Sequence, residues 1–119
     1  MSAAEVICEV RYHIDRHTLS EFKEYARTWV KLIERHGGSH QGYFLSRKAP
    51  VGATMSFPEF GGDEESLIAV ARFEFPDETA YLRYRDEVRK DPDGIEANSR
   101  YGSNPPFKRY ERIFLENLV

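Results

Sequence analysis

Four histidines are the residues of this sequence that most directly suggest metal binding or proton transfer. His13 and His17 are four positions apart, but the interval crosses a predicted boundary between a strand and a helix, so the i, i+4 geometry of a helical zinc site does not apply. The glycines of "HGGSH" interrupt the chain between His36 and His40 in the same way. Because no acid or cysteine completes a recognisable ligand set, the sequence predicts neither a metal site nor a bound cofactor.

His40 and Tyr43 are the better candidates for a functional site. Both lie where the chain leaves a predicted helix and enters the next strand, and segments at strand ends often hold functional residues. An imidazole near a phenol could bind a polar ligand or transfer a proton. The alternative is that His40 caps backbone carbonyl groups while Tyr43 packs in the core. His13, near the end of the first predicted strand, is a second candidate proton acceptor.

Charged residues alternate with apolar ones in two predicted strands, where Arg11 accompanies Glu9 and Arg72 accompanies Glu74. In surroundings of low dielectric constant, the two arginines could bind an anionic ligand. The interpretation that we favour is a ladder of charges that fixes strand register and the pairing of subunits.

The elements that must position these residues follow from hydrophobic periodicity. Strands are expected at about residues 5–14, 41–48, 66–75 and 107–117. A helix over about 19–36 has apolar residues at steps of three and four, and Trp29 on its apolar face either packs in the core or lies beside a ligand. Thr18 and Glu21 have the spacing of a capping box that would begin this helix, and the glycine pair after it would end it.

The second half of the chain repeats this order with a longer connection. Residues 49–65 are expected to form a long loop between two strands, and this loop is either a functional lid or a tolerated insertion. A second helix begins at Pro76 and Asp77, with Tyr81, Tyr84 and Val88 on its buried face. A short helical or irregular piece follows at about 92–101.

Two successive strand–helix–strand units predict an α+β domain of ferredoxin-like type, βαββαβ, with a four-stranded antiparallel sheet and both helices on one face. The first and third strands are then central neighbours that turn apolar residues toward the helices. The opposite face is expected to mix charged and apolar residues, namely Ile7, Glu9, Arg11, His13, Ile68, Val70, Arg72, Glu74 and Phe114. Because such a face is poorly suited to water, we expect two copies to bury it against each other as a homodimer.

Length and composition fit one cytoplasmic domain that covers residues 1–119. Charged residues make up 31% of the chain, with a net charge of -3 and no basic stripe, so neither nucleic acid nor a membrane is an expected partner. No window approaches the ~18 apolar residues that a membrane span needs. The single cysteine, Cys8, cannot form an internal disulfide and is expected to be a small buried residue.

The stretches "GGSHQGYF", "YLRYR" and "YERIF" resemble bacterial members of the NIPSNAP family, and the resemblance covers nearly the whole chain. It implies a dimeric α+β barrel of ferredoxin-like subunits, and it supplies no catalytic motif that could be transferred. The segment between "SRK" and "SLIAV" is longer than in related sequences. The wider group of dimeric barrels includes cofactor-free monooxygenases and haem-degrading enzymes, which gives an enzymatic hypothesis by fold analogy.

Two functions remain open from the sequence. The first is a homodimeric binding or interaction protein with a cavity between sheet and helices for a small, partly apolar molecule. The second is a cofactor-independent monooxygenase or isomerase that acts on a small aromatic or polyketide-like substrate. In the second case, His40 or His13 would accept a proton, and Arg72 or Arg11 would stabilise an anion. The residues predicted to bind the ligand are Tyr43, Arg11, Arg72 and Trp29.

Overall fold

The computed structural model describes residues 5–53 and 66–119, so residues 54–65 of the predicted loop lie outside the described part of the chain. The elements in chain order are β1 (Val6–Asp15), a 3-10 turn (Arg16–Thr18), α1 (Leu19–Arg35), β2 (Ser39–Leu45), β3 (Ser66–Phe75), α2 (Glu78–Lys90), α3 (Pro92–Gly102) and β4 (Arg109–Leu115). The short piece expected at about 92–101 is therefore a helix.

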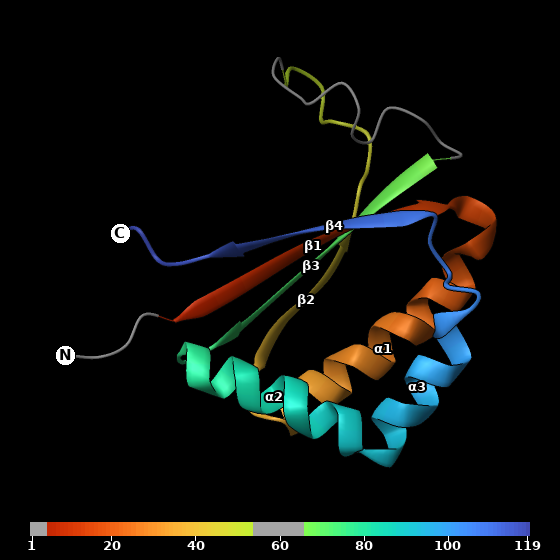
Figure 1. The fold of residues 1–119 in the computed structure, drawn as a ribbon. Helices are drawn as coiled ribbons and strands as arrows, with labels where there is room; N and C mark the ends of the chain where they lie inside the picture. Colours follow the sequence, from red (N-terminus) through yellow and green to blue (C-terminus); the bar gives the residue numbers. More distant parts are fainter. Residues whose placement is uncertain (1–4, 54–65) are drawn as a thin grey trace.

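The four strands form one antiparallel sheet in the order β2-β3-β1-β4. The central pair, β1 and β3, runs without interruption from Val6 opposite Phe75 to Asp15 opposite Ser66. All three helices lie on one side of the sheet (Figure 1). This arrangement confirms the predicted α+β fold of ferredoxin-like topology.

The observed β2 differs from its predicted span, since it runs over Ser39–Leu45 rather than about 41–48. The hydroxyl oxygen of Ser46 accepts a hydrogen bond of 3.0 Å from the backbone nitrogen of Ile68. This side chain takes the place of the backbone acceptor that a continuing strand would supply, and the regular pairing ends there.

The start of α1 also differs from prediction. The hydroxyl of Thr18 donates a hydrogen bond of 2.9 Å to the backbone oxygen of Asp15, across the 3-10 turn, and accepts none from the helix. The predicted capping box of Thr18 and Glu21 is therefore wrong, because the turn that precedes the helix already uses the hydroxyl. By contrast, Asp77 caps α2 by accepting a hydrogen bond of 2.8 Å from the backbone nitrogen of Ala80.

The core lies between the sheet and the helices and is built from alternate residues of the central strands. The buried residues of β1 and β3 on this side are Cys8, Val10, Tyr12, Ile14, Leu67, Ala69, Ala71, Phe73 and Phe75. Burial raises the pKa of Cys8 to about 11, so its thiol stays protonated and packs as a small apolar group, as predicted. Tyr81, Tyr84 and Val88 form the buried face of α2, which confirms the expected stripe.

The edge strand β4 turns a different set of side chains toward the helices from the set that the sequence predicted. Phe114 pairs with Cys8 and Tyr110 pairs with Tyr12, so Tyr110, Arg112 and Phe114 share the helix side of the sheet. The predicted position of Phe114 on the opposite face is wrong. β4 carries apolar residues at both odd and even positions, and its alternation alone could not decide which set turns inward.

Helix α3 is held tightly against α2 by a glycine. A Cβ atom on Gly94 would overlap the backbone oxygen of Val88, so no larger residue fits at this position. Asp91, which caps α3 by accepting from the backbone nitrogen of Asp93 at 2.9 Å, also accepts from the guanidinium of Arg35 in α1 at 2.9 Å. The ends of the three helices are thereby fixed to one another.

We expect Gly94→Ala to lower the free energy of unfolding by roughly 1–3 kcal/mol, the range for overpacking, because α3 must move away from α2. Gly102→Ala, at the other end of α3 with no atom near its Cβ position, should change it by less than about 0.5 kcal/mol. Urea denaturation of both variants measures the difference. Equal stabilities would contradict a tight joint between α2 and α3.

Candidate ligand-binding site

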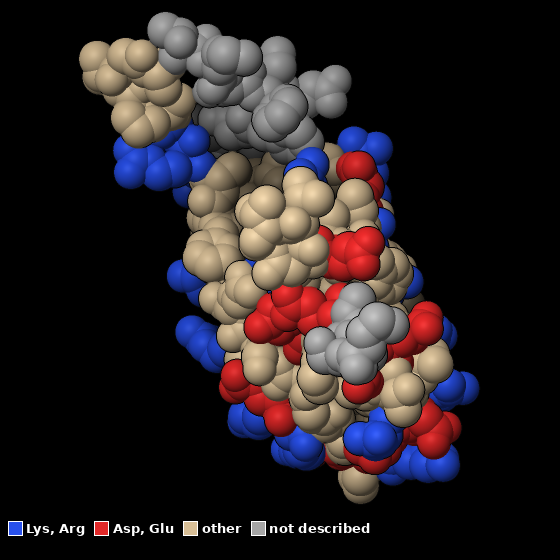
Figure 2. Space-filling view, turned by 90° about the vertical axis from the view of Figure 1, so that its left-hand side faces the viewer, with Lys and Arg blue, Asp and Glu red and all other residues tan. Residues whose placement is uncertain are grey.

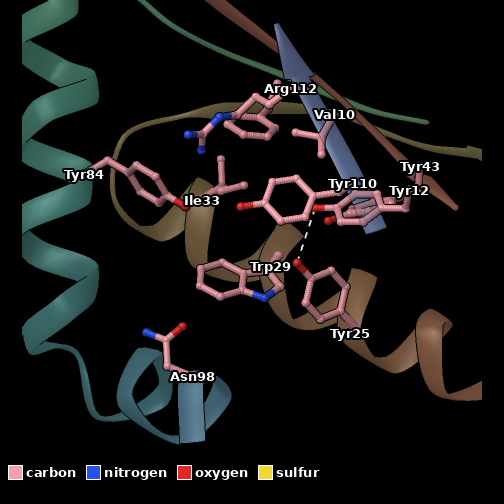
Figure 3. A pocket seen from close by; sticks show the side chains of 11 residues that line it. Val10, Tyr12, Tyr25, Trp29, Ile33, Tyr43, Tyr84, Asn98, Tyr110 and Arg112 are labelled. Atoms are coloured by element: carbon pink, nitrogen blue, oxygen red, sulfur yellow. Dashed lines mark hydrogen bonds between the residues drawn. The ribbon is translucent and has the colours of Figure 1, made fainter. Parts of the chain in front are cut away.

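A cavity of about 330 Å³ lies between the sheet and the helices. Its walls come from β1, β2, β3, β4 and all three helices, and the lining residues are Val10, Tyr12, Tyr25, Trp29, Ile33, Tyr43, Phe73, Tyr84, Asn98, Tyr110 and Arg112 (Figure 3). This volume is within the lower range of small-molecule sites. The predicted cavity between sheet and helices is therefore present.

Regular secondary structure accounts for the positions of the lining residues. Tyr25, Trp29 and Ile33 recur every four residues along one face of α1, and Val10 and Tyr12 are successive inward residues of β1. Helix α3 packs mainly on α1 and α2 rather than on the sheet, which leaves space beside β4. The cavity occupies that space.

Five tyrosine side chains bring hydroxyl groups to the walls. The hydroxyl oxygens of Tyr12 and Tyr25 are 3.3 Å apart, and either can donate to the other. Burial raises the pKa values of Tyr12, Tyr25, Tyr43 and Tyr84 well above the ordinary value. These phenols therefore remain protonated, and they can donate hydrogen bonds to a ligand but do not act as bases near neutral pH.

Arg112 carries the only formal charge among the described residues that line the cavity. It reaches in from the open β4 edge, and its guanidinium carbon lies 5.1 Å above the ring centre of Phe114. Figure 3 shows the guanidinium and the hydroxyls of Tyr84 and Tyr110 directed into the space between β4 and α2. In residues 5–53 and 66–119 no carboxylate and no imidazole lines the cavity, so these walls can bind and orient a molecule but supply no general base.

Two buried polar atoms close to this cavity have no hydrogen-bond partner within the described ranges of the chain. They are the Nε1 atom of Trp29 and the hydroxyl of Tyr101, and both rings pack against Tyr25. Buried polar atoms are normally paired, in the protein or with a bound molecule. Trp29 thus presents an unused donor at the cavity wall.

His40 and Tyr43 come together as predicted, with ring centres 5.1 Å apart and nearly parallel planes. The imidazole also stacks on Phe73, and whereas Tyr43 and Phe73 line the cavity, His40 is not among the described lining residues. Its Nδ1 atom accepts from the backbone nitrogen of Gly42 at 2.8 Å, so the proton of the neutral ring is on Nε2, which is buried and has no partner among the residues that the structure describes. Burial lowers the pKa of His40, against the opposing effect of Glu34.

Three further predicted site residues, Arg11, Arg72 and His13, lie on the opposite face of the sheet. Arg11 and Arg72 both donate to the carboxylate of Glu9, at 3.1 and 2.6 Å, and His13 lies 2.8 Å from Glu111. Neither arginine reaches the cavity, so the structure does not combine them with His40 and Tyr43. The hydrogen bond from Arg72 lowers the pKa of Glu9, which agrees with a ladder of charges across the paired strands.

Sequence reasoning missed Arg112, Tyr110 and Asn98 as cavity residues. The only available signal was the spacing of Tyr110, Arg112 and Phe114, which share one face of a strand. Asn98 gave no signal, because nothing in the sequence fixes where α3 packs.

A second hollow, of about 650 Å³, lies where β1 begins and β4 ends. Its rim carries three acids, and its lining residues are Glu5, Val6, Glu78, Tyr81, Phe114, Leu115 and Glu116. Figure 2 shows acidic side chains gathered on this side of the molecule, with no continuous basic patch on the visible face. Within the described ranges, no group of three or more histidine, cysteine or acidic residues could hold a metal ion, and no helix is long and apolar enough to cross a membrane.

An antiparallel ferredoxin-like sheet with helices on one side and an aromatic cavity between the two layers defines an α+β domain with an internal ligand-sized site. The NIPSNAP family model matches residues 8–115, and the chain belongs to the NIPSNAP family. No curated protein sequence matches it.

Solved structures share this fold at low sequence identity. A NIPSNAP family protein from Agrobacterium tumefaciens is 13% identical, with a TM-score of 0.68 over 99% of this chain and 90% of that one. An uncharacterised NIPSNAP-like domain protein from Burkholderia xenovorans is 17% identical, with a TM-score of 0.65 over 96% and 85%. SnoaB, a cofactor-independent oxygenase from Streptomyces nogalater, is 17% identical, with a TM-score of 0.53 over 95% and 92%.

The contact between Glu9 and Arg72 should make stability depend on pH. Because the pKa of Glu9 is lowered in the folded state, its contribution is complete above the ordinary value of 4.5 and is lost as the pH falls through the folded value. Glu9→Gln should therefore destabilise the protein at pH 7 and progressively less below pH ~4.5.

A double-mutant cycle with Arg72→Gln provides the control. We expect a coupling free energy of about 0.5–1 kcal/mol at pH 7, because solvent around Arg72 screens the pair. Zero coupling in urea denaturation would show that the two side chains contribute independently.

Proposed function

We propose that this NIPSNAP protein is a cytoplasmic homodimer that binds a small, partly apolar molecule in the cavity between its sheet and helices. The observation that carries the proposal is a cavity of about 330 Å³ with aromatic walls and hydrogen-bond donors. Such a combination is typical of small-molecule sites, in which apolar walls supply affinity and a few polar groups supply orientation.

Binding without chemistry is the function that the cavity walls favour. The phenols stay protonated, and the imidazole of His40 stacks on the lining residues Tyr43 and Phe73 without itself being among the described lining residues. A general base must lie within hydrogen-bond reach of the proton that it removes. No lining residue meets this requirement.

The proposal of a homodimer rests on the open face of the sheet. Apolar side chains stand there beside charges that are already paired within the subunit, as Glu9 is with Arg72. Phe44 and Ile113 are 57% and 52% exposed. A face with satisfied charges and exposed apolar groups is suited to a copy of itself related by a two-fold axis.

The alternative is a cofactor-independent monooxygenase or isomerase, and the similarity to SnoaB favours it. In that case the cavity would hold the substrate, and His40 would become the base only if Tyr43 moved aside. Oxygen consumption with a quinol, lost when the cavity is blocked, would favour this alternative. Binding of a probe with no turnover would favour the first proposal.

Asn98→Phe should block the cavity, because Asn98 lies in its wall on the exposed side of α3 and a phenyl ring can enter the space without displacing core residues. We expect at least a tenfold weaker affinity for the neutral two-ring probe 2-naphthamide, about 1.4 kcal/mol, by isothermal titration calorimetry. Ser99→Phe, at the next exposed position outside the lining, is the matched control and should bind normally. Unchanged binding in Asn98→Phe would place the ligand elsewhere.

Ile113→Glu should dissociate the proposed dimer, because it puts a charge on the open face of β4. Leu82→Glu changes an equally exposed apolar residue (53%) on α2 and should leave the dimer intact. Sedimentation velocity of both variants and the wild type gives the result. A wild-type monomer at micromolar concentration would refute the dimer.

A further inference from the structure

The described residues that line the cavity include one arginine and no acid, so their net charge is positive. We propose that its ligand is an aromatic carboxylate, bound through its acid group by Arg112 and through its ring by the aromatic walls. This inference rests on the proposed function, namely that the cavity is a ligand site, and it adds the charge and the chemical class of the ligand.

Arg112 forms no ion pair with any carboxylate in the part of the chain that the structure describes. Two acids of the same and the adjacent strand are engaged on the other face, where Glu111 contacts His13 and Glu9 contacts Arg72. The strand alternation that directs Arg112 inward directs Glu111 outward. The positive charge at the cavity is therefore not neutralised by a neighbouring side chain.

The guanidinium is also held in a definite position. It lies 5.1 Å above the ring of Phe114, and the positive charge of Arg112 acts on the hydroxyl of Tyr84 across the cavity. A guanidinium stacked by one face keeps the N–H groups of its edge available, and these match the two oxygens of a carboxylate. A phosphate, with its larger charge, would normally be bound by more than one cation, and Arg112 stands alone in the lining.

The remainder of the cavity fits the body of such a ligand. Figure 3 shows Trp29 across the space from Arg112, with Tyr110 between them. The indole offers a flat wall for a ring, and its Nε1 atom is a buried donor without a partner in the described residues. A volume of about 330 Å³ is that of roughly ten water molecules, which corresponds to an aromatic acid of one or two rings.

The test compares 2-naphthoate with its neutral analogue 2-naphthamide by isothermal titration calorimetry at pH 7.5 and low salt. Because a hydrogen-bonded ion pair at a partly exposed arginine is involved, we expect the wild type to bind the carboxylate about tenfold more tightly. Arg112→Gln should lower the affinity for the carboxylate about tenfold relative to that for the amide, so that the ratio of the two affinities, which is the readout, approaches one. Arg109→Gln removes the same charge from the same strand on its opposite face, beside His13, and should retain the preference.

Equal affinity of the two probes in the wild type, or a preference that survives in Arg112→Gln, would overturn the inference. The proposed function would still stand in either case if amide binding remained sensitive to Asn98→Phe. Absence of binding of both probes would overturn the inference and would also count against the cavity as a ligand site.

Discussion

The uninterrupted pairing of β1 with β3 is the constraint on which the other features of this structure depend. Ten consecutive pairs, from Val6 opposite Phe75 to Asp15 opposite Ser66, assign every side chain of the two central strands to one face or the other. Tyr12 and its neighbours thereby reach the helices, and Glu9 is placed beside Arg72 on the opposite face. The same β1–β3 register therefore determines both the cavity on one face of the sheet and the charged residues on the other.

The sequence predicted those parts of the fold in which one local pattern is long and unambiguous. The alternation of β3 and the helical stripe of α1 are of this kind, and both elements lie where they were expected. Failures occurred where a competing contact decides the structure, as with Thr18, whose hydroxyl serves the preceding turn. The prediction of which β4 side chains face the core failed for another reason. An edge strand with apolar residues at odd and even positions can turn either set toward the core, and only its pairing with β1 decides between them.

The site was predictable only in part for the same reason. A cavity between sheet and helices follows from the fold, and Trp29 and Tyr43 lie in its wall. Arg11 and Arg72 were attractive candidates because their types suit an anion, but their strand positions turn them away from the helices. Arg112 has the same side chain but lies on the helix side of the sheet, so residue type without register could not show which arginine lines the cavity.

The joint between α2 and α3 has a consequence for how ligand preference can diversify on this scaffold. At Gly94 the two helices meet closely, and the nearest atom of α2 to the position of a Cβ is the backbone oxygen of Val88. Neither Gly94 nor Val88 is among the described lining residues, so this contact does not depend directly on the residues that face the cavity. Asn98 and Arg112 are exposed members of the lining, so they can be replaced without repacking the core, and new specificities can arise on the same scaffold.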